Sequence, residues 1–118
     1  MPSRRFSESR IALIAKIRKY SKNSNFWKAI EKFALKSRKA LPEVNIDKLN
    51  RLTSPNDTIF VPGKVLAGGG TLRHPIQVAA FSFSKAAIKA IIQGGGKVIS
   101  IEKLQEQNPN GSKVKIIV

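Results

Sequence analysis

Apolar runs separated by glycine-rich turns dominate residues 57–104, and this alternation constrains the fold more than any other feature of the chain. The runs 58–61, 64–67, 76–83 and 97–101 have the length and composition of strands, and Pro62-Gly63 is predicted to turn the chain between the first two. Residues 85–93 predict a helix capped by Ser84, with Gly94 left-handed at its end and with three inward-facing side chains, Ile88, Ile91 and Ile92. With a final strand at 114–118, residues 57–118 predict an α/β core.

Two basic helices are predicted before this core. The first begins after a cap at Ser7 and ends near Lys22, with an apolar side formed by Leu13, Ile14, Ile17 and Tyr20. The second begins at a Ser24 or Asn25 cap and ends at Pro42, with an apolar face formed by Phe26, Ile30, Phe33 and Ala34. The first forty residues carry 12 Lys and Arg against 2 acids. The pair therefore predicts a helical hairpin over residues 1–42 that is apolar inside and basic outside.

Residues 43–56 differ from both neighbours because their charges balance. Asn45 is predicted to cap a short helix whose inner face contains Ile46, Leu49 and Leu52. This neutral joint would link the basic part to the core. A length of 118 residues is that of one domain, so we expect residues 1–118 to fold as a single unit.

The net charge of +15 is the dominant property of the whole chain. It exceeds what solubility requires, so a polyanionic partner is predicted, and RNA, DNA and anionic membranes are the candidates. The first helix lacks the exposed aromatic face of a membrane-surface helix, and no apolar run is long enough to span a bilayer. The absence of Cys and the single His exclude disulfides and thiolate- or His-rich metal sites. Without a signal peptide, the protein is expected to be intracellular.

Glycine triplets at 68–70 and 94–96 are the features that most resemble a nucleotide-binding site. Neither fits the P-loop pattern or the dinucleotide fingerprint, because the second follows a helix and a strand separates the first from the next helix. Residues 94–96 are interpreted as a tight turn. For residues 68–70, a turn and a bare backbone pressed against phosphates are both retained. His74 lacks a marked acid or nucleophile partner, so no enzyme activity, cofactor or small-molecule substrate is predicted.

Residues 57–96, DTIFVPGKVLAGGGTLRHPIQVAAFSFSKAAIKAIIQGGG, closely resemble the large-subunit ribosomal protein family "L eighteen e" of archaea and eukaryotes. That family is related to bacterial large-subunit protein fifteen. The likeness extends over nearly the whole chain, and the short chain is typical of an archaeal member. The resemblance implies a structural protein of the large ribosomal subunit in the cytoplasm, bound to ribosomal RNA beside neighbouring ribosomal proteins, without catalysis. It also implies an irregular superhelix of strand-strand-helix units, which agrees with the echo between residues 63–66 and 96–99.

The predicted RNA contacts are basic residues of the N-terminal part and of the loop that contains the first glycine triplet. The tail and first helix contribute Arg4, Arg5, Arg10, Arg18, Lys19 and Lys22. A second group at helical spacing consists of Lys28, Lys32, Lys36 and Lys39. The loop contacts are Lys64, Arg73 and His74. Such cations meet phosphates largely without regard to sequence, so a basic chromatin-type protein bound to DNA is the alternative.

Overall fold

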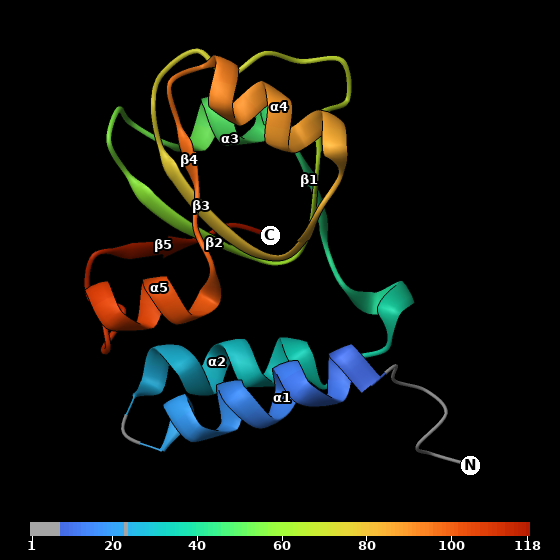
Figure 1. Ribbon diagram of the computed structural model, residues 1–118, viewed down its shortest axis with the longest axis vertical. Coiled ribbons are helices and arrows are strands. Elements are labelled where there is room, and N and C mark those ends of the chain that lie inside the picture. Colours follow the sequence, from blue (N-terminus) through green and yellow to red (C-terminus); the bar gives the residue numbers. More distant parts are fainter. Residues whose placement is uncertain (1–7, 23) are drawn as a thin grey trace.

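The computed structural model describes residues 8–22 and 24–118 (Figure 1). Its elements follow one another in the order α1 (Glu8–Ser21), α2 (Asn25–Ala34), the 3₁₀ turn η2 (Arg38–Ala40), β1 (Glu43–Asn45), α3 (Ile46–Leu52), β2 (Thr58–Leu66), β3 (Gln77–Phe83), α4 (Lys85–Gln93), β4 (Lys97–Val98), α5 (Ile101–Gln107) and β5 (Val114–Ile116). The predicted α/β class, with helices first and a mixed core after them, is confirmed. The predicted cap at Ser7 lies outside the described residues.

All strand pairs in the sheet are parallel, and the main path is β1-β2-β3-β4. β5 pairs with the first part of β2, at residues 58–60, whereas β1 pairs with the last part, at residues 64–66. Helices cover both faces, as parallel sheets require (Figure 1). The α1–α2 hairpin and α5 pack on one face, and α3 and α4 pack on the other.

Alternation along β2 and β3 divides the core into two clusters. Ile59 and Val61 point towards α3 and α4, while Phe60 between them points towards the hairpin. The same alternation separates Val78 from Ala79 in β3. Because successive strand side chains point to opposite faces, one apolar strand supplies both clusters. The continuous apolar runs of the sequence are thus explained by burial on two sides.

The predicted turn at Pro62-Gly63 is wrong, because β2 continues through it as one strand. Between the pairs Val61–Ala80 and Lys64–Ser82, β2 has one residue more than β3, which defines a bulge. A bulge tolerates Pro62 inside a buried strand because its missing N–H leaves no ladder bond unmade. Sequence alone does not distinguish this bulge from a hairpin turn, since both use proline and glycine.

The second helix ends at Ala34, eight residues before the predicted end at Pro42. Leu35 is the C-cap, and its N–H donates to the carbonyl of Glu31. The Ala34 carbonyl instead accepts hydrogen bonds from the guanidinium of Arg10 in α1. A terminal carbonyl that is satisfied in this way no longer needs a further helical turn. Lys36 and Lys39 therefore do not share a helical face with Lys28 and Lys32.

Four smaller expectations also need correction. The left-handed residue after α4 is Gly95, with φ +83°, and not Gly94. The strand predicted at 97–101 stops at Val98, because Ser100 caps helix α5, which was not predicted. The second repeat unit is consequently strand-helix-strand, and only β2-β3-α4 follows the strand-strand-helix pattern. Leu52 and Ile92, both predicted to face inward, are largely exposed.

Neighbouring isoleucines in α4 provide a test of this burial. Ile91 is fully buried in the cluster beneath α4, and Ile92 is 60% exposed. Ile91→Ala should lower the free energy of unfolding by about 2–5 kcal/mol, whereas Ile92→Ala should change it by about 0.5 kcal/mol or less. Urea denaturation followed by circular dichroism measures both variants. Similar losses from the two substitutions would show that α4 is rotated relative to the sheet.

Candidate nucleic-acid interface

Packing of the α1–α2 hairpin determines which of its cations face solvent. Trp27, Ile30 and Ala34 are fully buried against the sheet, and Ser24 caps α2 by accepting from the Trp27 N–H. Lys28 and Lys32, one helical turn apart, lie on the exposed side of α2. The outward lysines are thus held by a rigid apolar anchor on the opposite side of the helix.

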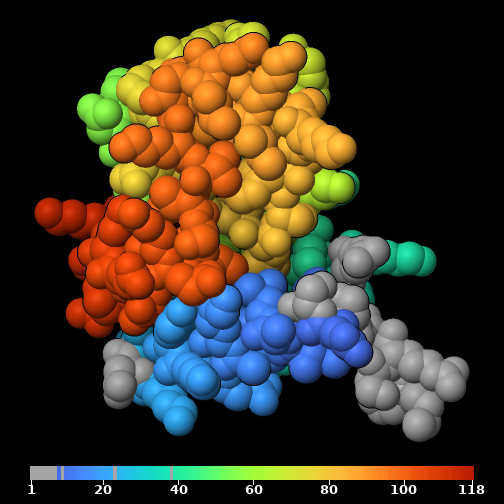
Figure 2. All heavy atoms as spheres, viewed as in Figure 1, coloured from blue at the N-terminus to red at the C-terminus, as the bar shows by residue number. Residues whose placement is uncertain are grey.

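The first helix presents its cations in the same manner. Ile14 and Ile17 are buried, and the exposed residues that follow them include Arg18, Lys19 and Lys22. Figure 2 shows the surface of α1 at one end of the molecule, away from α4 at the other end. Within the described residues, four exposed lysines of the hairpin form no ion pair with an acid, and we define them as the hairpin lysines: Lys19, Lys22, Lys28 and Lys32.

Arg18 has a partner on α2 but remains accessible. Its Nε donates to Glu31 Oε2 at 2.9 Å, and the Ser21 hydroxyl lies 3.0 Å from Glu31 Oε1. These hydrogen bonds, that of Arg18 first, hold the pKa of Glu31 below its usual value. The Arg18 side chain is 61% exposed, so much of its guanidinium still faces solvent. The contact ties the two helices together without covering the cation.

Arg10 was predicted on the outer side of the first helix, but its guanidinium lies against the end of α2. Nη2 donates to the carbonyls of Ala34 at 2.8 Å and Lys36 at 3.0 Å, and Cζ lies 5.7 Å from the centre of the Phe81 ring. A cation is favourable at a helix C-terminus because it opposes the partial negative charge there. Arg10 therefore fastens the hairpin to itself and to β3.

The remaining predicted cations of the N-terminal part are dispersed. Lys36 is exposed, with its Nζ 4.8 Å above the centre of the Phe33 ring. Lys39 is exposed in the turn η2. Arg4 and Arg5 lie outside the described residues. The predicted four-lysine stripe is therefore reduced to Lys28 and Lys32 on the helix itself, with the other two on the segment that leaves it.

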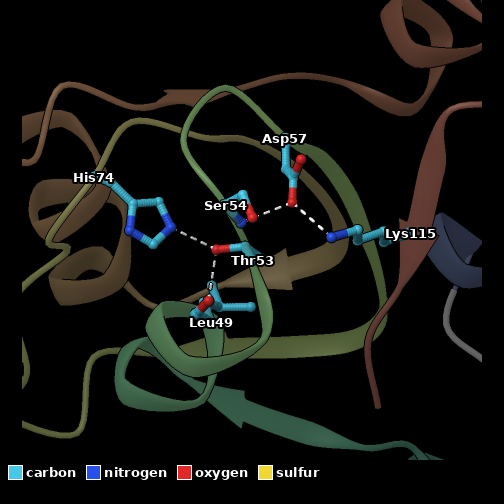
Figure 3. Close-up of polar contacts among 6 residues, drawn as sticks. All are labelled: Leu49, Thr53, Ser54, Asp57, His74 and Lys115. Carbon is cyan, nitrogen blue, oxygen red and sulfur yellow. Dashed lines mark hydrogen bonds and ion pairs between the residues drawn. The ribbon is translucent and has the colours of Figure 1, made fainter.

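His74 is held by an intramolecular contact (Figure 3). Its Nε2 lies 2.7 Å from Thr53 Oγ1, and that hydroxyl donates its single proton to the Leu49 carbonyl at 2.7 Å. The hydroxyl must therefore accept from the ring, which places a proton on Nε2. The ring thereby fastens the loop before β3 to the end of α3.

Asp57 forms a second link in the same region (Figure 3). Its Oδ2 accepts from Lys115 Nζ and from the Ser54 N–H, both at 2.8 Å. The hydrogen bond of Lys115, followed by that of Ser54, holds the pKa of Asp57 below its usual value. The turn before β2 is therefore connected to β5, and Lys115 is already paired.

The glycine loop, residues 67–73, lies beside α3. Gly68 and Gly69 have positive φ values of 59° and 77°, and a Cβ on Gly70 would lie 2.7 Å from Asp47 Oδ1. The second triplet also permits close approach, since a Cβ on Gly94 would lie 2.5 Å from that of Leu72. The interpretation of residues 94–96 as a turn is thus confirmed. Whether residues 68–70 contact phosphates stays a prediction.

A polar cleft lies between the glycine loop and α3, with a volume of about 430 Å³. It is lined by Asn45, Asp47, Asn50, Arg51 and Arg73. Sequence reasoning predicted Arg73 as a contact but assigned Arg51 to the neutral joint. Only the fold brings the two arginines to one cleft, because they lie on separate elements of the chain. Lys64, exposed in β2 beside Glu43 of β1, does not line it.

Metal and membrane-spanning sites do not occur in the part of the chain that the structure describes. Among residues 8–22 and 24–118, no three His, Asp or Glu side chains are grouped so that they could hold a metal ion. None of the helices described here is long and apolar enough to cross a membrane. The dispersed basic surface and the polar cleft are the features that remain.

Comparison with known proteins agrees with this arrangement. The family model for ribosomal proteins 50S-L15 and 50S-L18e and their 60S counterpart matches residues 24–99, from the cap of α2 to just beyond β4. The chain belongs to this family. The match includes one helix of the hairpin, both glycine triplets and the cleft residues, so these features lie within the region shared with the L15/L18e family.

Individual relatives extend the likeness to most of the chain. Large ribosomal subunit protein eL18 of Methanospirillum hungatei is 41% identical over 94% of this chain and 93% of its own length. The protein of the same name from Methanococcus maripaludis is 46% identical over 89% of this chain and 88% of its own. That of Pyrobaculum aerophilum is 35% identical over 95% and 93%. The family resemblance predicted from the sequence is confirmed.

Proposed function

We propose that this protein is a structural constituent of the large ribosomal subunit in the cytoplasm, where it binds ribosomal RNA during translation. The observation that carries the proposal is the likeness to large ribosomal subunit proteins named eL18 over nearly the full length of both chains. The net charge of +15 and the exposed hairpin lysines give the physical means, because phosphates attract such a surface. Neighbouring ribosomal proteins are its further partners.

The hairpin lysines are proposed as the principal phosphate contacts. They lie outside an anchor of buried side chains, so the sheet holds them at fixed positions and little ordering is needed on binding. Their action is to reduce repulsion between packed RNA segments while the core fixes the distance between those segments. Contacts of this kind position the protein and carry no base specificity.

The other predicted residues are proposed as secondary contacts. Exposed cations in this group are Arg18, Lys36, Lys39, Lys64 and Arg73. Arg10 and His74 are assigned a supporting role, since each already binds another part of the chain. Arg4 and Arg5 are retained as tail contacts on the basis of charge alone.

We infer that the protein has no catalytic activity and no small-molecule substrate. The family assignment supports this inference, and the Nε2 of the only His is engaged with Thr53. Membrane binding is likewise not proposed. The chromatin-type DNA alternative shares the charge argument but gains no support from the relatives, which are named as ribosomal proteins.

Sedimentation tests the assignment to the ribosome. Native cell extract is separated on a sucrose gradient, and fractions are probed for this chain before and after a high-salt wash. We expect co-migration with the large subunit that resists moderate salt. Migration as a free small protein, or with DNA, would overturn the proposal.

Loss of the hairpin lysines should flatten the salt dependence of RNA binding. Replacement of all four by Gln removes up to four phosphate contacts, each of which contributes about 0.9 to the slope of log K against log salt on a duplex-like site. The slope should therefore fall by up to about 3.6. Titrations of structured ribosomal RNA at several salt concentrations measure it.

The control for this experiment removes the same charge elsewhere. Gln substitutions at four exposed lysines outside the hairpin lower the net charge equally, at Lys85, Lys97, Lys103 and Lys113. A smaller change in slope is expected, because these lysines belong to other surfaces. Equal effects of the two quadruple variants would contradict the assignment of the main contacts to the hairpin.

We also propose that residues 1–118 form one domain, in which the 1–42 part and the 57–118 core fold together. The support is the aromatic cluster in which Trp27 of α2 meets Phe60 of β2, with ring centres 5.9 Å apart. Residues from α1, α2, α5 and both central strands share this cluster. A hairpin that buries its apolar face only against the sheet has little reason to fold alone.

A further inference from the structure

The polar cleft between α3 and the glycine loop is built as a rigid recess. Asn50 holds the loop from both ends of its amide, since Nδ2 donates to the Thr71 carbonyl at 2.8 Å and Oδ1 accepts from the Arg73 N–H at 2.9 Å. Asn45 is fixed as the cap of α3 by its bond to the Lys48 N–H. The walls of the cleft are therefore held in place without a ligand.

Three charged side chains in this cleft have no internal partner. Within the described residues, no ion pair joins Asp47 to Arg51 or Arg73, although all three line the same cleft. All three are exposed, and none shows a side-chain hydrogen bond there. The recess thus offers a carboxylate acceptor and two planar guanidinium donors that are separate from one another. A simple anion would satisfy the arginines but would be repelled by Asp47.

A nucleotide with hydrogen-bond donors on its base edge matches this arrangement. Guanine carries two adjacent donors, N1–H and the N2 amino group, which a carboxylate can accept together. Its O6 and N7 acceptors, or its phosphate, suit an arginine fork. Proteins read unpaired RNA bases in this way, by hydrogen bonds to the base edge and by stacking on guanidinium planes. The cleft volume of about 430 Å³ lies in the range of small-ligand pockets, about 300–1,000 Å³.

We propose that this cleft receives one unpaired guanine nucleotide of the RNA, with Asp47 accepting from the base edge and Arg51 and Arg73 holding its acceptor edge or phosphate. The inference rests on the proposed function, because it requires that the protein bind RNA. It adds a base-specific contact, at α3 and the glycine loop, to the sequence-independent attraction of the hairpin lysines.

Binding to a set of RNA hairpins tests the proposal with the full chain. The hairpins share one stem and differ only in a single bulged nucleotide, G, A, C or U, and a fifth has no bulge. We expect the G-bulge hairpin to bind about tenfold more tightly than the other three at fixed salt. Arg51→Gln and Arg73→Gln should reduce this advantage while largely preserving binding to the unbulged stem.

Asp47→Asn provides the sharpest variant. It should abolish the preference for G without weakening overall RNA affinity, because it also removes a negative charge. Glu106→Gln is the matched control, since it neutralises an exposed acid on α5, outside the cleft, and should preserve the preference. Circular dichroism and thermal unfolding verify that each variant is folded, and Asp47→Glu, which keeps the carboxylate, replaces any that is not.

The outcomes separate the two proposals. Equal affinity of the wild-type chain for the four bulges, or a G preference that survives Asp47→Asn, would overturn the cleft assignment while leaving RNA binding intact. Failure to bind any of the hairpins or structured ribosomal RNA would overturn the proposed function as well. A G preference that Asp47→Asn removes and Glu106→Gln retains would establish the cleft as a nucleotide site.

Discussion

Gly63→Ala is expected to lower the free energy of unfolding by about 3 kcal/mol or more. A Cβ on Gly63 would lie 2.0 Å from the Pro42 carbonyl oxygen, and that oxygen accepts a hydrogen bond from the Lys64 N–H at 3.0 Å. The clash is with backbone, so no side-chain rotation relieves it. Overpacking alone typically costs about 1–3 kcal/mol, and a disrupted buried hydrogen bond adds about 1–3 kcal/mol.

The same methyl group at Gly69 is the control for this prediction. Gly69 is exposed, and nothing lies within 4 Å of an added Cβ, although its φ of 77° is left-handed. Gly69→Ala should therefore cost only the backbone strain of about 1–2 kcal/mol. Chemical denaturation followed by circular dichroism compares the two variants. A loss below about 1 kcal/mol for Gly63→Ala would mean that β1 does not enter the sheet beside the bulge.

Trp27→Ala should lower the free energy of unfolding by about 3–5 kcal/mol, the cost of removing a large buried aromatic side chain. Trp27 is fully buried, with its ring centre 5.0 Å from that of Tyr20 and 5.2 Å from that of Phe26. It also meets Phe60 of β2, so its loss loosens the hairpin from the sheet. RNA affinity should fall in parallel, because the hairpin lysines lose their fixed support.

Trp27→Phe separates loss of the ring cluster from loss of volume. It keeps an aromatic ring at the centre of the cluster, and it removes the indole Nε1–H, which is buried without a hydrogen-bond partner among the described groups. We expect a cost clearly below that of Trp27→Ala. Similar losses from the two variants would argue against the aromatic contacts as the source of stability.

The wild-type chain offers the corresponding test of the one-domain proposal. Trp27 is the single tryptophan, so its fluorescence reports on the hairpin, while far-ultraviolet circular dichroism reports on the whole chain. Coincident unfolding transitions are expected from the two signals. Separate midpoints would show that the hairpin and the core unfold independently.

Local patterns in the sequence predicted the elements that depend on adjacent residues. Helix α4 was predicted with its Ser84 cap and its bounds, and β3 was predicted within one residue, because capping and strand composition are short-range signals. Helix α5 had a similar signal, since Ser100 precedes an amphipathic run with Glu102 in its first turn, but this signal was overlooked. Its omission was an error of interpretation and not a limit of the sequence.

Distant contacts decided the features that sequence reasoning missed. The end of α2 depends on Arg10, 24 positions away from Ala34, and the Pro62-Gly63 bulge depends on how β2 pairs with β3. Neither partner is visible in the local pattern. The polar contacts of the candidate site have the same origin, since His74 meets Thr53 and Arg73 meets the cleft of Arg51 only after folding.

By itself, the sequence determined the α/β class, the basic N-terminal helices and the family, because composition, charge and short-range periodicity survive without knowledge of the fold. Only the tertiary structure decided which cations remain available. It placed Arg10 against the end of α2 and left Lys28 and Lys32 exposed, although all three belong to the same basic segment. The physical reason is that a cation's role depends on the carbonyls and carboxylates within reach, and chain packing sets those distances.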